Sequence, residues 1–145
     1  MIGFFEHQLL SYKKSHIKNL LALAKADGFV HDKEVAVIQK IGKKYGLKER
    51  QVDELIKSDE KFALNVPNNI HDKINLLYDL ILVVLADGVI EKNEIAFCEE
   101  VVKKFGMKKE IVKWMIEDVF DKGLPPIPEV WADLREEAKE RFSKK

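Results

Sequence analysis

Six acidic residues fall into two groups at matching places in the chain, and carboxylates grouped in this way could bind a divalent cation. The groups are Asp27, Asp32 and Glu34, then Asp87, Glu91 and Glu94. Carboxylate oxygens are the ligands that hard cations such as calcium or magnesium prefer. A basic surface on a protein partner would be attracted by the same charges. The sequence therefore predicts a cation-binding or partner-binding site at each group.

The spacing excludes a calcium loop of the EF-hand kind. Such a loop places oxygen ligands at its first, third and fifth positions and a glycine at its sixth. Counted from Asp27, the third and fifth positions are Phe29 and His31, and the glycine, Gly28, comes second. Any cation bound here would need another geometry. His31 is interpreted as an exposed cap residue in preference to a metal ligand.

The two acidic groups belong to a longer internal repeat with an offset of sixty residues. Ala26-Asp27-Gly28 returns as Ala86-Asp87-Gly88, and Lys43-Lys44-Tyr45-Gly46 returns as Lys103-Lys104-Phe105-Gly106. A helical unit that is repeated in the sequence predicts two similar halves related by a pseudo-two-fold axis around one core. We place the two repeat units at about 17–57 and 77–117, with a joint over 58–69 that contains a proline and several asparagines.

Apolar residues recur at helical spacing along nearly the whole chain, and no strand-like alternation is present. The predicted fold class is an all-α bundle of about seven to eight helices in a single domain spanning residues 1–145. Three prolines and a glycine within 123–128 end the preceding helix. A last helix over about 128–142 should dock on the bundle through one apolar stripe. That stripe consists of Val130, Trp131, Leu134, Ala138 and Phe142.

Each acidic group lies in a predicted turn between two helices, residues 26–34 and 86–94, which we call the acidic corners. Each corner also has a purely structural interpretation. Gly28 and Gly88 would end one helix, while Val30 and Ile90 would fill the core between helices. If His31 and Glu91 precede the next helix, Glu34 and Glu94 fall at its third position. A glutamate there accepts from a free backbone N–H and complements the positive end of the helix.

Asp27 and Asp87 fit the structural interpretation less well than the glutamates do. An aspartate at the C-terminal end of a helix opposes the helix dipole. Either the carboxylate accepts hydrogen bonds from backbone N–H groups of the loop, or it contacts a ligand outside the chain. Both alternatives stay open at the level of sequence.

At these corners the chain resembles the TerB-like family of tellurite resistance. The likeness rests on Ala26-Asp27-Gly28, Val30 and Glu34 and on their second copy, and it covers residues 17–119. A similar module stands at the N-terminus of the DjlA co-chaperone. The resemblance implies a helical bundle with internal pseudo-symmetry. It also implies a non-catalytic role in the cytoplasm, in stress or metal-ion response, with acidic residues binding a cation or a protein partner. A pure interaction scaffold, in which the acids only cap helices, is the alternative.

Composition narrows the remaining classes of function. The formal net charge is +0, which argues against a nucleic-acid binder, and the lysine pairs at 43–44, 103–104 and 108–109 are interpreted as solvated helix faces. The lone Cys98 is interpreted as a buried apolar residue, and Asp79, inside an apolar run, as either buried or on an exposed stripe. No phosphate-binding glycine loop or nucleophile motif is present, so no enzyme is predicted. We expect no membrane insertion and a cytoplasmic protein with a protein partner, and the sequence leaves the oligomeric state open.

Overall fold

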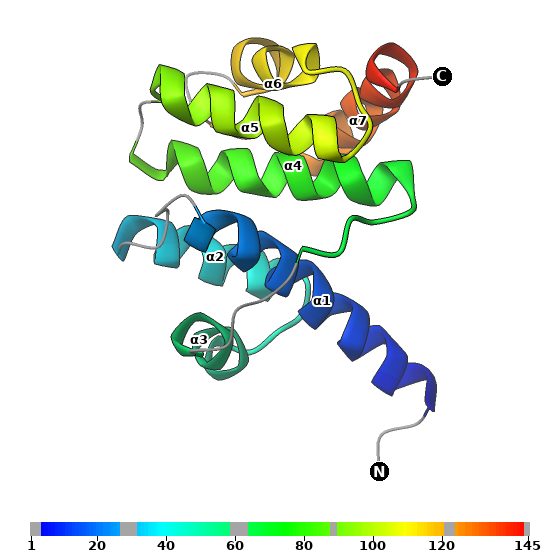
Figure 1. Cartoon of the computed structure of the whole chain (residues 1–145). Helices are drawn as coiled ribbons and strands as arrows, with labels where there is room; N and C mark the ends of the chain where they lie inside the picture. Colours follow the sequence, from blue (N-terminus) through cyan, green and yellow to red (C-terminus); the bar gives the residue numbers. More distant parts are fainter. Residues whose placement is uncertain (1–3, 27–31, 59–63, 88–89, 121–123, 144–145) are drawn as a thin grey trace. The chain divides into compact units, whose positions relative to one another are not determined.

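The fold was obtained as a computed structural model. It describes residues 4–26, 32–58, 64–87, 90–120 and 124–143, with residues 4–13 and 87 described by their main chain alone. Its elements, in chain order, are α1 (Phe4–Ala26), α2 (Asp32–Lys44), α3 (Glu49–Lys57), α4 (Ile70–Val84), the 3-10 turn η1 (Leu85–Asp87), α5 (Lys92–Lys104), α6 (Glu110–Trp114), the π-helical turn η2 (Met115–Val119) and α7 (Pro128–Phe142) (Figure 1). The described chain is therefore an all-α bundle with seven α-helices, which confirms the predicted class. Within the described ranges, no helix has the length and apolar character needed to cross a membrane.

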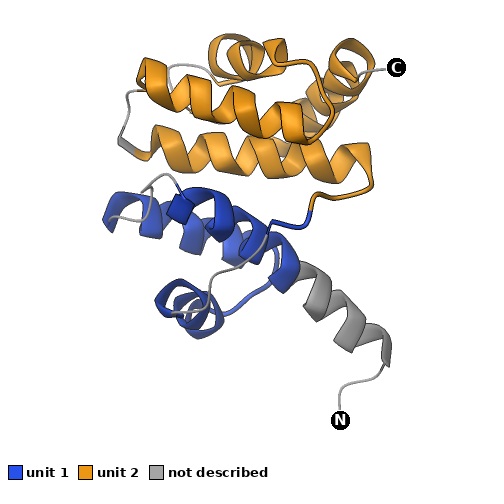
Figure 2. Ribbon diagram, in the orientation of Figure 1, with its two compact units in different colours: residues 1–65 blue, residues 66–145 orange. Residues whose placement is uncertain are grey.

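The chain divides into two compact units (Figure 2). Unit 1 covers residues 1–65 and contains α1 to α3, and unit 2 covers residues 66–145 and contains α4 to α7. The division falls inside the segment 58–69, where the sequence predicted the joint between repeats. Whether the two units act as one domain stays a prediction.

In unit 1, α2 and α3 approach each other closely at a glycine. A Cβ atom added to Gly42 would overlap the Cγ2 atom of Val52, which is fully buried on α3. Only a residue without a side chain lets these two helices pack at this distance. The buried face of α1 presents Ile17, Leu20, Leu21 and Ala24, each with no exposed surface. These residues follow the three-to-four spacing expected of an amphipathic helix.

In unit 2, α7 packs against α4 through aromatic rings. Trp131 stacks on Tyr78 with ring centroids 4.0 Å apart, and Tyr78 in turn stacks on Phe120 at 5.1 Å. The last helix therefore folds back onto its own unit. Its predicted stripe is wrong at one position, because Val130 is 44% exposed. Trp131 and Ala138 lie seven residues apart on one face of the helix, and Val130 is turned away from that face by about 100°.

The repeated Lys-Lys-aromatic-Gly sequence gives the same helix end in each unit. Gly46 and Gly106 have positive φ angles of 87° and 73°. Leu47 N donates to Gly42 O at 2.9 Å, and Met107 N donates to Val102 O at 3.2 Å. These bonds, with those from the glycine N–H groups to Lys43 O and Lys103 O, form a Schellman motif after α2 and after α5. The two units are thus locally equivalent at this turn, while the pseudo-two-fold arrangement of whole units stays a prediction.

Candidate functional site

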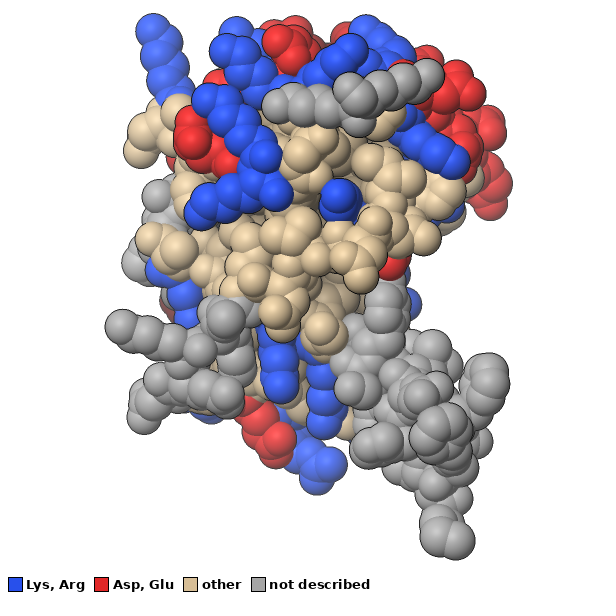
Figure 3. Space-filling model, turned by 45° about the vertical axis from the view of Figure 1, so that its right-hand side comes forward, with Lys and Arg blue, Asp and Glu red and all other residues tan. Residues whose placement is uncertain are grey.

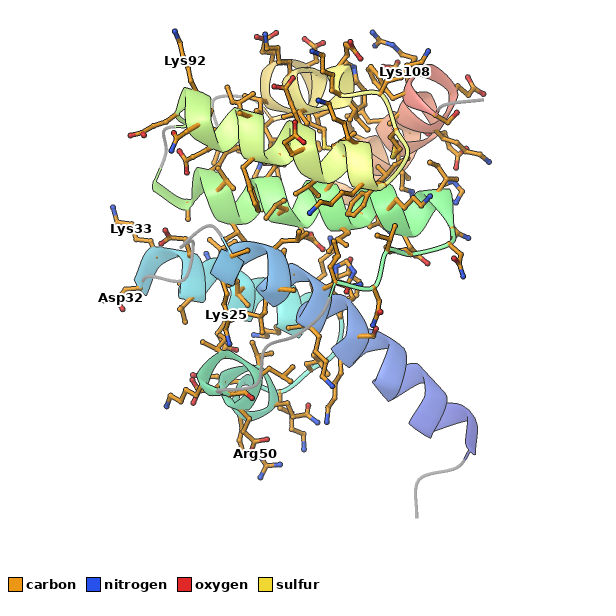
Figure 4. The ribbon with its side chains drawn as sticks, viewed as in Figure 1. Lys25, Asp32, Lys33, Arg50, Lys92 and Lys108 are labelled. Carbon is orange, nitrogen blue, oxygen red and sulfur yellow. The ribbon has the colours of Figure 1, made fainter. Side chains whose placement is uncertain are left out.

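The first acidic corner is only partly described. Asp27, Gly28, Val30 and His31 lie outside the described residues. Of the two remaining acids, Asp32 begins α2, is exposed and points away from the helices of unit 1 (Figure 4). Glu34, two residues later, is 6% exposed. The two described acids of this corner therefore lie in different surroundings, one in solvent and one buried.

In the second corner, Glu94 accepts a hydrogen bond at the start of α5. Glu91 is the N-cap residue of α5, and its backbone N–H donates to Oε1 of Glu94 at 2.8 Å. This is the return bond of a capping box, which satisfies one of the unpaired N–H groups at the start of a helix. Ile90 is half-buried, while Gly88 and the side chain of Asp87 lie outside the described residues. The predicted capping role is thus confirmed for Glu94.

A cation site is not assembled by the described acids. Across the described ranges, no three His, Cys, Asp or Glu side chains come together in a group able to hold a metal ion. The cation hypothesis therefore depends on Asp27 and on the side chain of Asp87, and it stays a prediction. Among the described acids of the two corners, Asp32 and Glu91 are exposed, Glu34 is buried, and Glu94 caps the start of α5.

Two side chains that the sequence singled out lie in the core. Cys98 has no exposed surface, as expected for a small apolar role. Asp79 is also fully buried, which decides between the two alternatives for that residue. Burial, with a smaller contribution from the charge of Asp79, raises the pKa of the Tyr78 hydroxyl to about 12. Tyr78 therefore stays neutral in the core over the physiological range.

An open groove in unit 1 is rimmed by lysines that the sequence did not single out as a group. The last turns of α2, the α2–α3 turn and the start of α3 enclose about 450 Å³. The residues that line it are Gln39, Lys40, Lys43, Leu47, Lys48 and Glu49. Its walls are largely apolar. Lys40, Lys43 and Lys48, which line it, are exposed, and lysine side chains generally keep the ammonium group in water while their carbon stems cover apolar surface. This groove, which we call the α2–α3 groove, combines an apolar interior with three positive charges and one negative charge.

Three large apolar side chains are exposed on the segment that leads into α7 and on the first turn of that helix. Leu124 is 69% exposed, Ile127 is 62% exposed and Val130 is 44% exposed. We call these three residues the apolar strip. Pro125 and Pro126 separate Leu124 from Ile127, and Pro128 follows Ile127. Ile127 has φ −66° and ψ 156°, close to polyproline II geometry. Proline restricts the main chain, so this segment has little freedom to turn the strip inward.

Charge elsewhere on unit 2 is mixed. Lysine, arginine, aspartate and glutamate side chains intermingle over the upper part of this unit (Figure 3). An interface with nucleic acid would require a dominant positive face. The view in Figure 3 shows no dominant positive face on the described residues of that part. This agrees with the formal net charge of +0 for the whole chain.

Comparisons of this chain with protein-family models, with curated proteins and with solved structures found no match. Function must therefore be inferred from the residues and their geometry.

The sequence contained a signal for the strip but only part of one for the groove. Leu124 and Ile127 stand among prolines, where apolar residues cannot continue a buried helical stripe. For the groove, Lys43 belongs to a lysine pair that was interpreted as a solvated helix face, and Lys43 is indeed exposed. What spacing alone did not reveal is that the Gly46 turn brings the start of α3 beside the end of α2.

Proposed function

We propose that this chain is a non-catalytic protein-interaction module whose apolar strip contacts a partner. The proposal is carried by the exposure of Leu124 and Ile127 in the proline-rich segment and of Val130 in the first turn of α7. Single exposed apolar residues are ordinary on protein surfaces, but three within seven consecutive residues favour a contact site. A segment already restricted by prolines loses less conformational entropy when it binds.

The geometry of the strip suits a known mode of recognition. Proline-rich segments in the polyproline II conformation dock into grooves lined by aromatic side chains on the partner. Ile127, flanked by Pro126 and Pro128, has the dihedral angles of that conformation. We therefore expect the partner to present an apolar groove to this segment.

The acidic corners fit this proposal as structural features. Glu94 caps α5, and the described acids do not gather into a metal-binding group. The resemblance of the two Ala-Asp-Gly corners to TerB-like proteins suggests the setting, which is a role in cytoplasmic stress response of the tellurite-resistance type. In that setting the module would act by binding another protein.

Affinity capture from the native host tests the proposal. The wild-type chain is compared with a Leu124→Ser/Ile127→Ser/Val130→Ser variant, whose changes lie on exposed side chains and should leave the fold intact. We expect at least one partner that the wild-type chain retains and the variant loses. The matched control replaces exposed polar residues of the same helix, Glu129→Ala/Asp133→Ala, and should retain that partner. Identical sets of captured proteins for wild type and strip variant would refute the proposal.

A further inference from the structure

The α2–α3 turn of unit 1, beside which the groove lies, has a counterpart in unit 2 that the end of α7 crosses. In unit 2, Lys108 N donates to Phe142 O at 2.8 Å, and Met107 forms an isolated antiparallel bridge with Ser143. Phe142 is 5% exposed, and its ring lies 5.3 Å from that of Trp114. The end of α7 therefore crosses the α5–α6 turn of its own unit at Met107 and Lys108, while Glu100 and Lys103 of α5 stay exposed.

The two turns are comparable because they share one backbone geometry. Each follows a Schellman motif at a glycine with positive φ, and Leu47 and Lys48 stand sixty positions before Met107 and Lys108. In unit 1 the N–H of Lys48 donates instead to a side chain of its own helix start, Oε1 of Gln51, at 2.9 Å. The unit 1 turn thus satisfies its own backbone N–H group and leaves a groove of about 450 Å³ beside it.

Charge also differs between the two turns. In unit 2, Lys103 pairs with Glu100 at 3.1 Å across one helical turn. The position equivalent to Glu100 is Lys40 in unit 1, so two lysines, Lys40 and Lys43, stand where unit 2 has an ion pair. Like charges at this spacing repel each other slightly. With Lys48 they give the groove three positive charges, against which the lining contributes only Glu49.

We propose that the α2–α3 groove binds an acidic segment of a partner protein, which crosses the α2–α3 turn as the end of α7 crosses the α5–α6 turn. The acidic side chains would pair with the rim lysines, and an apolar side chain would enter between the lysine stems above Leu47. Two observations carry the inference: a chain segment crosses the matching turn in unit 2, and the charge of the lysines that line the groove favours an acidic occupant. The inference rests on the proposed interaction function and names a second contact surface, separate from the apolar strip.

The partner chemistry follows from this contrast. α7 carries Arg135, Lys139 and Arg141 along with its acids. Within unit 2, Arg135 donates to Asn75 Oδ1 at 3.4 Å and Arg141 pairs with Glu137 at 3.2 Å. The same segment would meet three lysines at the α2–α3 groove. A segment of similar shape with its basic residues replaced by acids would be attracted instead. Selectivity between the two turns would come from charge, because the turns share their backbone geometry.

Fluorescence anisotropy with labelled peptides tests the proposal on the full chain. One probe is a peptide of residues 128–143, and the second is the same peptide with Arg135, Lys139 and Arg141 replaced by glutamate. We expect the acidic peptide to bind about tenfold more tightly than the unchanged one, and its affinity to fall as salt is added. If the acidic peptide does not bind at concentrations up to about 1 mM, where the binding free energy is only about 4 kcal/mol, the proposal is refuted.

Charge-reversal variants locate the binding site. Lys40→Glu/Lys43→Glu/Lys48→Glu should weaken binding of the acidic peptide by about tenfold or more. The matched control, Lys92→Glu/Lys109→Glu/Lys113→Glu, makes the same change of net charge on exposed lysines of unit 2 and should leave the affinity nearly unchanged. Circular dichroism and thermal melting confirm that both variants fold. Equal losses in the two variants would mean that net charge, and not the groove, attracts the peptide.

Two further measurements separate the remaining outcomes. If inorganic phosphate alone displaces the acidic peptide at millimolar concentration, the groove is a pocket for small anions and the peptide proposal fails. The strip variant Leu124→Ser/Ile127→Ser/Val130→Ser should bind the acidic peptide as the wild type does. Loss of peptide binding in the lysine variant alone, with capture through the strip unchanged, supports the groove proposal. Failure at the groove would leave the proposed interaction through the strip standing, and failure at the strip would leave the groove result standing.

Discussion

The indole of Trp131 on α7 lies against the ring of Tyr78 on α4, with centroids 4.0 Å apart and ring planes inclined by 29°. Both residues are almost completely buried. Large aromatic side chains contribute much of the buried apolar area in a small core, and stacked pairs add about 0.5–1.5 kcal/mol to that. This pair is an aromatic contact that joins the last described helix, α7, to the first helix of unit 2, α4.

Replacing Trp131 should therefore destabilise unit 2 strongly. We expect Trp131→Ala to lower the free energy of unfolding by about 3–5 kcal/mol, because a large cavity remains beside Tyr78. Val130→Ala, at the neighbouring exposed position, should change it by less than about 0.5 kcal/mol. Urea denaturation followed by circular dichroism measures both. Similar losses in the two variants would contradict the orientation of α7 described above.

Much of the helical plan could be predicted from sequence because it depends on local chemistry. Gly46 and Gly106 each stand where a helix needs a left-handed residue, and the structure ends α2 and α5 just before them. Pro128 begins α7, in agreement with the preference of proline for the first turn of a helix. Local signals of this kind do not depend on the rest of the fold.

Features that depend on contacts between distant residues could not be predicted in the same way. An aspartate within an apolar helix can face the core or solvent, and only the packing around α4 shows that Asp79 is buried. The π-helical turn over Met115–Val119 directly follows α6, and the spacing of apolar residues does not distinguish a π-helical turn from an α-helical one. The α2–α3 groove depends on where a turn places lysines from two helices. The spacing of residues along the sequence does not show which side chains of two helices a turn brings together.

Gly42 gives a direct test of the close approach between α2 and α3. A methyl group at this position would overlap Val52, so Gly42→Ala should cost about 1–3 kcal/mol even though alanine is the better helix former. Shortening the opposing side chain should relieve the overlap. We therefore expect Gly42→Ala/Val52→Ala to be less destabilised than the sum of the two single variants by about 1 kcal/mol or more. Chemical denaturation of all four proteins completes the cycle, and simple additivity would argue against a close contact at this point.

The raised pKa of Tyr78 predicts a loss of stability at alkaline pH. An unfolded chain releases the tyrosine proton near pH 10, while the folded protein holds it to about pH 12. Between these values the folded state binds more protons than the unfolded state, so stability falls as pH rises. The stabilisation is complete below pH 10 and is lost as pH rises through 12, a change of about 2–3 kcal/mol.

Comparison with Tyr78→Phe isolates this contribution from other alkaline titrations. The variant should show a shallower decrease in the free energy of unfolding between pH 9 and pH 12, and the difference from wild type should grow across that range. Ultraviolet absorbance of tyrosinate gives an independent measure of the titration. Parallel stability curves for the two proteins would show that Tyr78 titrates near its ordinary pKa.

Substitutions of Glu94 distinguish a structural role of the second acidic corner from a cation-binding role, because the two roles depend on different properties of the side chain. A cap needs an acceptor oxygen, which glutamine also provides, whereas a hard cation needs the charge of the carboxylate. We expect Glu94→Gln to retain the wild-type melting temperature to within a few degrees, and Glu94→Ala to lose about 1 kcal/mol. We expect the melting temperature of the wild-type chain to stay the same when calcium or magnesium is added. A cation that did bind, at a hundred times its dissociation constant, would add about 2.7 kcal/mol of stability and would therefore raise the melting temperature measurably. A cation-dependent rise that disappears in an Asp27→Ala/Asp87→Ala variant would instead assign the corners to metal binding and their aspartates to the ligand set.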